Sequence, residues 1–216
     1  MIKELIFDLD GTLLDTSRDI CAVLNESLKR FNLPQISLQA LKEYLGNGAK
    51  TLVNRAVSES NSKYAEEVYE DYFINFANCK NELTTLYDGE AAALDAFKSA
   101  GIKLAVISNK PQLATERVVN QHLNKFGFDF IIGQSESNPL KPDPTTTLKV
   151  IEKFGVRKDE VLFVGDGETD ILTAANAGVK CVSVLWGYRS RKQLESAGAR
   201  IFAESFKELE NLVKSF

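Results

Sequence analysis

Five short runs of mostly apolar residues are spread along the chain, each bounded by Gly, Asp or Ser. Their lengths are those of strands, and near-continuous apolar character is typical of strands covered on both faces, as in a parallel sheet. We therefore expect buried strands at IKELIFD (2–8), IKLAVIS (102–108), FDFIIG (128–133), EVLFVGD (160–166) and KCVSVLW (180–186).

Helical patterns fill the intervals between the later runs. Asp88 and Asp143 stand where helix N-caps belong, and Gly101, Gly155 and Gly178 stand where helices end. The alternation of strand and helix predicts an α/β fold built on a doubly wound parallel sheet. The expected helices span 89–100, 112–123, 144–154 and 171–177, with a last one from Ser205 onward.

The stretch 16–82 interrupts this alternation. It has no convincing strand, and its apolar residues recur at helical spacing in four stripes, at 20–31, 38–45, 52–57 and 64–76. Four helices are too many for one crossover between the first two strands. We therefore expect an inserted helical domain at 16–82, with 1–15 and 83–216 forming the α/β core and the linkers near 14–17 and 81–88.

Composition narrows the class of protein. The 216 residues are 44% apolar and 26% charged, which is typical of a soluble globular chain. The net charge of −4, without a basic block, argues against a nucleic-acid partner. No apolar stretch approaches the ~18 residues of a membrane span, and no signal-peptide pattern is present. The three cysteines form no CxxC pair, so we expect buried thiols and a cytoplasmic location.

Polar residues gather at the ends of the expected strands, where ligands bind in open α/β sheets. One aspartate there is usually a turn former. Several neighbouring strand ends would, however, bring Asp8, Asp10 and Asp166 together, and two like charges ~4 Å apart repel by roughly 4 kcal/mol at a dielectric constant of 20. A cation resolves this repulsion. All-oxygen ligands without His or Cys favour Mg²⁺ over softer ions.

These residue types together suit phosphoryl transfer. Mg²⁺, Lys141, Ser108 and backbone N–H groups can receive a phosphoryl group. One carboxylate can attack phosphorus and form an aspartyl phosphate. A second carboxylate nearby can protonate the leaving alcohol and then deprotonate water. Gly11 permits a sharp turn and a close backbone approach.

Four motifs in order resemble those of the haloacid dehalogenase superfamily: DLDGT at 8–12, VISN at 106–109, LKPDP at 140–144 and GDGETD at 165–170. The resemblance implies a Rossmann-like core and identifies the helical insert at 16–82 as a cap domain. It implies that Asp8 is the nucleophile and Asp10 the general acid/base, and it supports ester hydrolysis, because phosphatases carry this second Asp. The other implied roles are phosphate binding by Gly11, Thr12, Ser108, Asn109 and Lys141, Mg²⁺ binding by Asp8, Asp166 and the backbone carbonyl of Asp10, and an outer position for Asp170.

Three further segments resemble bacterial phosphoglycolate phosphatases: YLGNGAKTLVNRAV (44–57), ISNKP (107–111) and VLWGYRS (184–190). The Gly46-Asn47-Gly48 turn is expected to reach over the site, where Asn47, Lys50 and Arg55 would meet a substrate carboxylate. An ordinary helix N-terminus with solvated charges is the alternative. The only histidine, His122, lies far from every motif and is expected to be structural.

The sequence thus predicts a Mg²⁺-dependent phosphomonoesterase acting on a small phosphate ester, with 2-phosphoglycolate the best single choice. Within the superfamily, a pyrophosphatase, a sugar or nucleotide phosphate phosphatase and a β-phosphoglucomutase stay open. A receiver-like phospho-acceptor domain and a noncatalytic scaffold are the alternatives outside enzymes of this class. No membrane partner is expected, and a monomer and a homodimer are equally compatible with the sequence.

Overall fold

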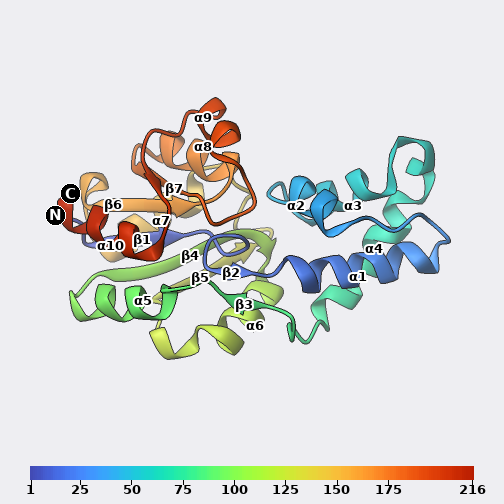
Figure 1. The fold of residues 1–216 in the computed structure, drawn as a ribbon, viewed down its shortest axis with the longest axis horizontal. Helices are drawn as coiled ribbons and strands as arrows, with labels where there is room; N and C mark the ends of the chain where they lie inside the picture. The colour runs from blue at the N-terminus through green and yellow to red at the C-terminus, as the bar shows by residue number, and fades with distance from the viewer.

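The computed structural model describes all 216 residues and contains a six-stranded parallel sheet in the order β5-β4-β1-β6-β7-β8 (Figure 1). All five expected strands are present, which confirms the predicted α/β fold. The sixth strand is very short and was not expected. The strands are β1 (Glu4–Phe7), β4 (Lys103–Pro111), β5 (Phe130–Gln134), β6 (Val161–Gly165), β7 (Lys180–Val184) and β8 (Phe202–Ala203).

Helices cover both faces of this sheet. Leu5 and Phe7 of β1 pack into one apolar cluster with residues of α5, α6 and α10. Ile6, between them, points to the opposite face and packs with residues of α7 and α8. The sheet is therefore buried on both sides, as its continuous apolar strands predict. The helices are α5 (Glu90–Ser99), α6 (Gln112–His122), α7 (Thr145–Phe154), α8 (Glu168–Ala177), α9 (Arg191–Ser196) and α10 (Phe206–Ser215), with short 3₁₀ turns η2 (Asn124–Phe126) and η3 (Lys158–Glu160).

The start of α5 differs from the expectation that Asp88 caps it. The N-cap residue is Gly89, in the left-handed region with a φ of 80°, and no side chain caps the helix there. Glu90 instead reaches back, and its Oε2 accepts a hydrogen bond from the Tyr87 N–H at 3.1 Å. The Glu90 carboxylate thus binds a backbone N–H that precedes the helix, whereas Asp88 makes no capping hydrogen bond.

The insert between β1 and β4 is helical, with its own apolar cluster of 15 buried residues, in which Ala114 is the only member from the rest of the chain. Figure 1 shows α1 to α4 gathered beside the sheet rather than on it. Where the chain enters and leaves, β2 (Leu14–Asp15) pairs antiparallel with β3 (Thr85–Leu86). The division into 1–15 with 83–216 and 16–82 stays a prediction. The insert's helices are α1 (Ser17–Arg30), α2 (Leu38–Tyr44), α3 (Ala49–Val57) and α4 (Ala65–Ala77), with the 3₁₀ turn η1 (Glu59–Tyr64).

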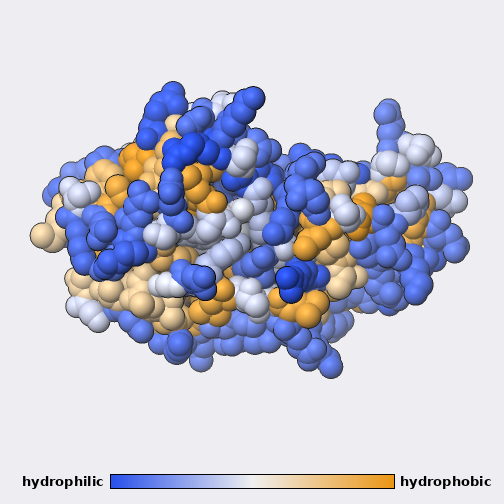
Figure 2. All heavy atoms as spheres, viewed as in Figure 1, coloured by the Kyte–Doolittle hydropathy of each residue, from blue (hydrophilic) through white to orange (hydrophobic).

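The surface is mainly hydrophilic on the face drawn in Figure 2, with apolar residues in separate patches. None of the helices is both long and apolar enough to cross a bilayer. Cys21 is buried, whereas Cys79 and Cys181 are half-buried, so the expectation of buried thiols holds for one of the three. The imidazole Nε2 of His122 lies 3.0 Å from the carbonyl oxygen of Asn81.

Candidate active site

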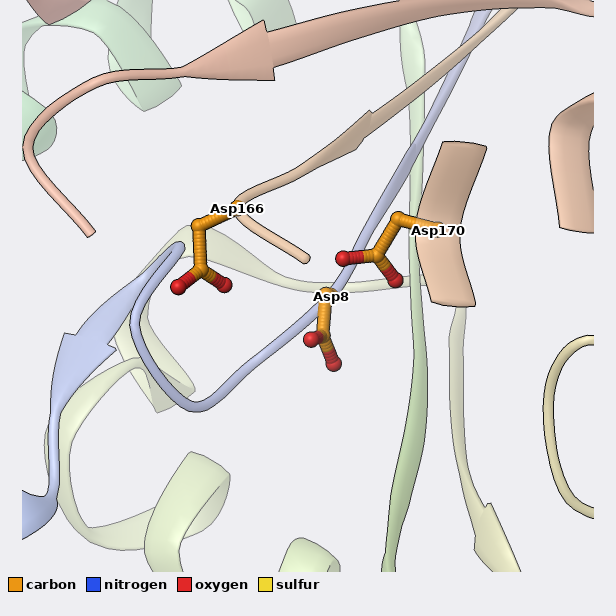
Figure 3. A group of neighbouring side chains, drawn as sticks. All are labelled: Asp8, Asp166 and Asp170. Atoms are coloured by element: carbon orange, nitrogen blue, oxygen red, sulfur yellow. The ribbon is translucent and has the colours of Figure 1, made fainter. Parts of the chain in front are cut away.

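Three aspartate side chains meet at the carboxyl ends of the central strands. Asp8 directly follows β1, Asp166 directly follows the neighbouring β6, and Asp170 lies in the first turn of α8. One carboxylate oxygen of each lies within 4.8 Å of the others, and Figure 3 shows the three groups turned toward a shared space. The predicted approach of Asp8 and Asp166 therefore occurs, and Asp170 joins them.

Lys141 supplies a single positive charge to this cluster. Its ammonium lies 2.8 Å from Asp8 Oδ1 and 2.7 Å from Asp170 Oδ1, and its side chain is only 3% exposed. It therefore sits behind Asp8, between two carboxylates. One cation against three carboxylates leaves a buried excess of negative charge.

The pKa values report this excess. Burial raises the pKa of Asp8 to about 8, against the attraction of Lys141, and Asp170 and Asp166 raise it further. Burial and the Asp170 charge raise the pKa of Asp166 to about 7. Burial alone would lower the pKa of Lys141, but Asp170 and Asp8 outweigh it and the net shift is upward. Buried oxygen ligands that lack positive charge fit a hard divalent cation such as Mg²⁺.

Asp166 is held from two sides. Its Oδ1 accepts from the Thr12 hydroxyl at 3.1 Å, and its Oδ2 accepts from the Tyr188 N–H at 2.7 Å. Gly11 packs directly on it, because a Cβ built at Gly11 would lie 2.4 Å from Asp166 Oδ2 and the φ of Gly11 is +91°. Only glycine combines this conformation with this closeness.

Gly11 and Thr12 are consequently not placed as expected for phosphate binding. The Gly11 N–H donates to the Leu14 carbonyl, and the Thr12 N–H donates to the Leu9 carbonyl, so both donors are used within the turn. Neither residue lines the neighbouring cavity, and Lys141 does not either. The structure thus places Gly11 and Thr12 as supports of Asp166.

A cavity of about 60 Å³ opens between the strand ends and the helical insert. Asp8, Asp10 and Asp166 line it from the sheet side. Tyr72 and Phe76 of α4 line it from the insert. The remaining lining comes from Ile20, Leu45, Gly46, Gly48, Ala49 and Leu52 on the insert and from Ser108, Asn109, Lys110, Pro111, Gly167, Thr169, Tyr188 and Arg189 on the sheet side.

Asp8 and Ser108 each present an unused group. Asp8 Oδ1 accepts from the Leu9 N–H and from Lys141, whereas Oδ2 accepts no hydrogen bond from the protein. The Ser108 hydroxyl accepts from the Lys110 N–H at 3.2 Å but donates to no protein acceptor. A nucleophilic oxygen and a free donor therefore face the same cavity from adjacent strands.

Asn109 is fully occupied in joining loops. Its side-chain amide donates to the carbonyls of Gly46 at 2.9 Å and Lys141 at 3.1 Å. Its Oδ1 accepts from the Lys141 N–H at 2.6 Å. The side chain that was expected to bind phosphate instead ties the Gly46 turn of the insert to the core.

Asp10 turns away from the carboxylate cluster. Its Oδ1 accepts from the Thr16 hydroxyl and from the Lys110 ammonium at 2.8 Å, and its Oδ2 lies 3.1 Å from the same ammonium. Its side chain is thus absent from the group that could hold a metal. That Asp10 offers a cation its backbone carbonyl stays a prediction.

The expected cap residues do not converge on the cavity. Gly46 and Gly48 line it, but Asn47 between them is exposed and does not. The Lys50 ammonium forms an exposed ion pair with Glu66 at 2.9 Å, and Arg55 donates to the Tyr44 carbonyl at 2.8 Å. Both side chains are exposed on the outside of the insert.

Two buried cations that sequence reasoning did not assign line the cavity instead. Lys110 follows Ser108 by two residues, and Arg189 lies between β7 and α9. The Arg189 guanidinium donates to the carbonyls of Lys42 and Leu45 at 2.6 Å each and to the Glu168 carboxylate at 3.1 Å. Both residues lie inside segments already singled out, ISNKP and VLWGYRS, so the signal was present without its assignment.

Comparisons with known proteins agree with this geometry. A family model described as haloacid dehalogenase-like hydrolase matches residues 5–184. A phosphoglycolate phosphatase from Vibrio parahaemolyticus is 31% identical over 223 residues, covering 98% of this chain and 96% of its own. One from Aquifex aeolicus is 34% identical over 188 residues, covering 87% and 86%.

Solved structures show the same likeness. A structure from Lactobacillus delbrueckii subsp. bulgaricus superposes with a TM-score of 0.90 at 28% identity and covers 98% of both chains. A predicted phosphoglycolate phosphatase from Haemophilus somnus superposes with a TM-score of 0.85, also at 28% identity, and covers 98% of this chain and 97% of its own. The similarity therefore extends over the insert as well as the sheet.

Proposed function

This chain belongs to the haloacid dehalogenase-like hydrolases, and on that premise we propose that it is a Mg²⁺-dependent phosphomonoesterase with 2-phosphoglycolate as its substrate. The products would be glycolate and inorganic phosphate. The observation that carries the proposal is the buried group of Asp8, Asp166 and Asp170. Its negative charge is only partly balanced by Lys141, and it lies beside the free hydroxyl of Ser108.

The proposed first step forms a bond between Asp8 Oδ2 and phosphorus while the ester P–O bond breaks. Asp8 suits this role because Leu9 and Lys141 fix its other oxygen and leave Oδ2 free. The Asp10 carboxyl gives its proton to the departing alkoxide, which leaves as the alcohol. In the second step water attacks phosphorus, Asp10 takes the water proton, and the bond to Asp8 breaks.

Mg²⁺ would be held by Asp8, Asp166 and the Asp10 carbonyl, and when bound it supplies charge stabilisation to the phosphoryl oxygens. Asp170 belongs to the outer part of this site, where it holds Lys141. Ser108 would donate its hydroxyl proton to a phosphoryl oxygen. Gly11 and Thr12 would act through Asp166 rather than through the phosphate.

The small cavity and the relatives support the choice of substrate. The cavity of about 60 Å³ favours a small metabolite. The relatives named above are phosphoglycolate phosphatases that this chain matches over most of its length.

A panel of phosphate esters tests the proposal. The panel comprises 2-phosphoglycolate, pyrophosphate, β-glucose 1-phosphate, a nucleoside monophosphate and an aryl phosphate, each assayed with Mg²⁺ and with EDTA. We expect Mg²⁺-dependent release of phosphate, with the highest kcat/KM for 2-phosphoglycolate. Turnover of 2-phosphoglycolate no better than of the aryl phosphate would contradict the substrate, and full activity of Asp8→Asn would contradict the mechanism.

A further inference from the structure

Lys110 is a buried cation that the proposed reaction leaves without a task. Its side chain is 3% exposed, and its ammonium lies 2.8 Å from Asp10 Oδ1. The same ammonium lies 4.7 Å from the centre of the Phe76 ring on α4. It therefore stands at the boundary between the strand ends and the insert, on the side of the cavity that Phe76 and Tyr72 close.

The other buried cations near the cavity are already committed. Lys141 is held between Asp8 and Asp170 and does not line the cavity. Arg189 donates to Glu168 and to backbone carbonyls at the end of α2. Lys110 bonds through its ammonium to Asp10 alone, and an ammonium carries three donors. It can thus hold Asp10 and a further acceptor at the same time.

We infer that Lys110 is the specificity-determining residue that binds a second anionic group of the substrate, a carboxylate on the alcohol side of the phosphate ester. The inference rests on the proposed phosphatase function and assigns a residue to the substrate class. The contact between Asp10 and Lys110 indicates which part of the substrate Lys110 would meet. Asp10 would protonate the ester oxygen, and it contacts the Lys110 ammonium directly. The alcohol portion of a bound ester would therefore lie next to Lys110.

A substrate carboxylate needs a cation to bind in a cavity that is lined by aspartates. Asp8, Asp10 and Asp166 already line the cavity, and a substrate carboxylate would enter against their negative charge. Opposite charges attract most strongly where water is excluded, and Lys110 is almost fully buried against an aromatic ring. The exposed Lys50 and Arg55, expected from the sequence to meet this carboxylate, lie outside the cavity.

The test compares two esters that differ mainly in this charge, 2-phosphoglycolate and 2-hydroxyethyl phosphate. Wild type should show at least a tenfold higher kcat/KM for 2-phosphoglycolate. In Lys110→Met, the preference should fall by about 10- to 100-fold, which is the usual cost of losing a hydrogen bond between charged groups. Lys110→Arg should retain part of the preference, and Lys50→Met, a matched exposed lysine, should retain all of it.

A purely structural role of Lys110 predicts a different result. If the ammonium only positions Asp10, Lys110→Met lowers kcat/KM for both esters equally, and this outcome would overturn the inference. Equal turnover of the two esters by wild type would also overturn it and would leave the phosphatase function intact.

A binding measurement separates this inference from the proposed function. In Asp8→Asn with Mg²⁺, calorimetry should show 2-phosphoglycolate binding that weakens by about 10- to 100-fold when Lys110→Met is added, while 2-hydroxyethyl phosphate binding changes little. Unchanged 2-phosphoglycolate binding would refute the role of Lys110. Binding with this pattern but no turnover by wild type would contradict the phosphatase function alone.

Discussion

Gly11 shows how one residue controls the position of a neighbouring carboxylate, that of Asp166. Its φ of +91° and the 2.4 Å that would separate an added Cβ from Asp166 Oδ2 leave no room for a side chain. We expect Gly11→Ala to displace Asp166 and to lower Mg²⁺-dependent phosphatase activity by at least about 100-fold, because correct geometry of a catalytic group is worth several kcal/mol. Activity measured against Mg²⁺ concentration checks this.

Gly155 provides the matched control for that variant. It also has a positive φ, +66°, but an added Cβ would meet no atom within 4 Å. Gly155→Ala should cost about 1–2 kcal/mol of stability through backbone strain and should leave activity unchanged. Wild-type Mg²⁺ activation in Gly11→Ala would show that Asp166 tolerates the displacement.

Glu4 should make the stability of the protein depend on pH. It is fully buried in β1, and neither carboxylate oxygen has a hydrogen-bond partner. Burial raises its pKa from 4.5 to about 8, despite nearby Lys103. Between these values the folded protein keeps a proton that the unfolded chain has released, so the free energy of unfolding falls as pH rises, by up to about 1.4 kcal/mol per unit.

Glu4→Gln tests this, because glutamine mimics the neutral acid at every pH. We expect the variant to gain a few kcal/mol over wild type at pH 8 and to match it near pH 4.5, in urea titrations across this range. Glu136→Gln, an exposed glutamate in the loop after β5, should follow wild type throughout. Burial also raises the pKa values of Asp8 and Asp166, so part of the pH dependence should remain in Glu4→Gln. A dependence as steep as that of wild type would show that Glu4 contributes none of it.

The sequence could predict the residues that stand at strand ends, and little beyond them. Asp8, Asp166 and Ser108 reach the cavity because a parallel sheet brings adjacent strand ends together, and apolar runs locate those ends. Lys110 and Arg189 lie in segments that the sequence singled out, but their contacts with Asp10, Phe76 and the end of α2 join residues distant in the chain and could not be read from local periodicity. Their roles, like those of the other site residues, stay predictions until tested.

At the scale of elements, Arg189 joins the α2 end to the core. The last carbonyls of a helix lack partners within it, and Arg189 satisfies those of Lys42 and Leu45 while Glu168 holds its other side. We expect Arg189→Met to loosen residues 42–48, raising their amide exchange rates and raising KM by about tenfold.

The control for the Arg189 variant lies two residues away. Arg191→Met removes an arginine whose side chain is 45% exposed and whose ion pairs lie on the surface. Surface ion pairs contribute little to stability. The amide exchange rates at 42–48 and the KM should therefore both stay at wild-type values. Equal effects of the two variants would contradict the prediction that Arg189 holds the end of α2 in place.

The sequence predicted the long strands and helices but not the two-residue strands. Five strands and the principal helices follow from runs and periodicities long enough to be read. The two-residue strands β2, β3 and β8 carry no such pattern, since their pairing depends on what lies beside them. The start of α5 differs from the prediction because Gly89, in the left-handed conformation, is the N-cap residue and no side chain caps the helix.

At the scale of the whole molecule, polar contacts hold the helical insert to the core, and Ala114 of α6 and Tyr188 also pack against the apolar cluster of the insert. Besides the β2–β3 ribbon, Asn109 holds the Gly46 carbonyl and Arg189 holds α2. Asp19 of α1 accepts from the Leu83 N–H at 3.0 Å and from the Thr84 hydroxyl at 2.7 Å, which fixes one linker to the insert. Polar contacts of this kind can break and re-form, and Ala114 is the only buried member of the insert's apolar cluster that would lose its packing.

We therefore predict that the insert opens and closes over the cavity. Mg²⁺ with orthovanadate, a phosphate analogue, should bridge the strand ends and favour the closed arrangement, so amide exchange should slow at 14–17, 42–48 and 81–88. Exchange within β1 and β6 should not change, since these strands are buried in either arrangement. Unchanged protection of the linkers would mean that the insert is fixed and that substrate enters by side-chain motion alone.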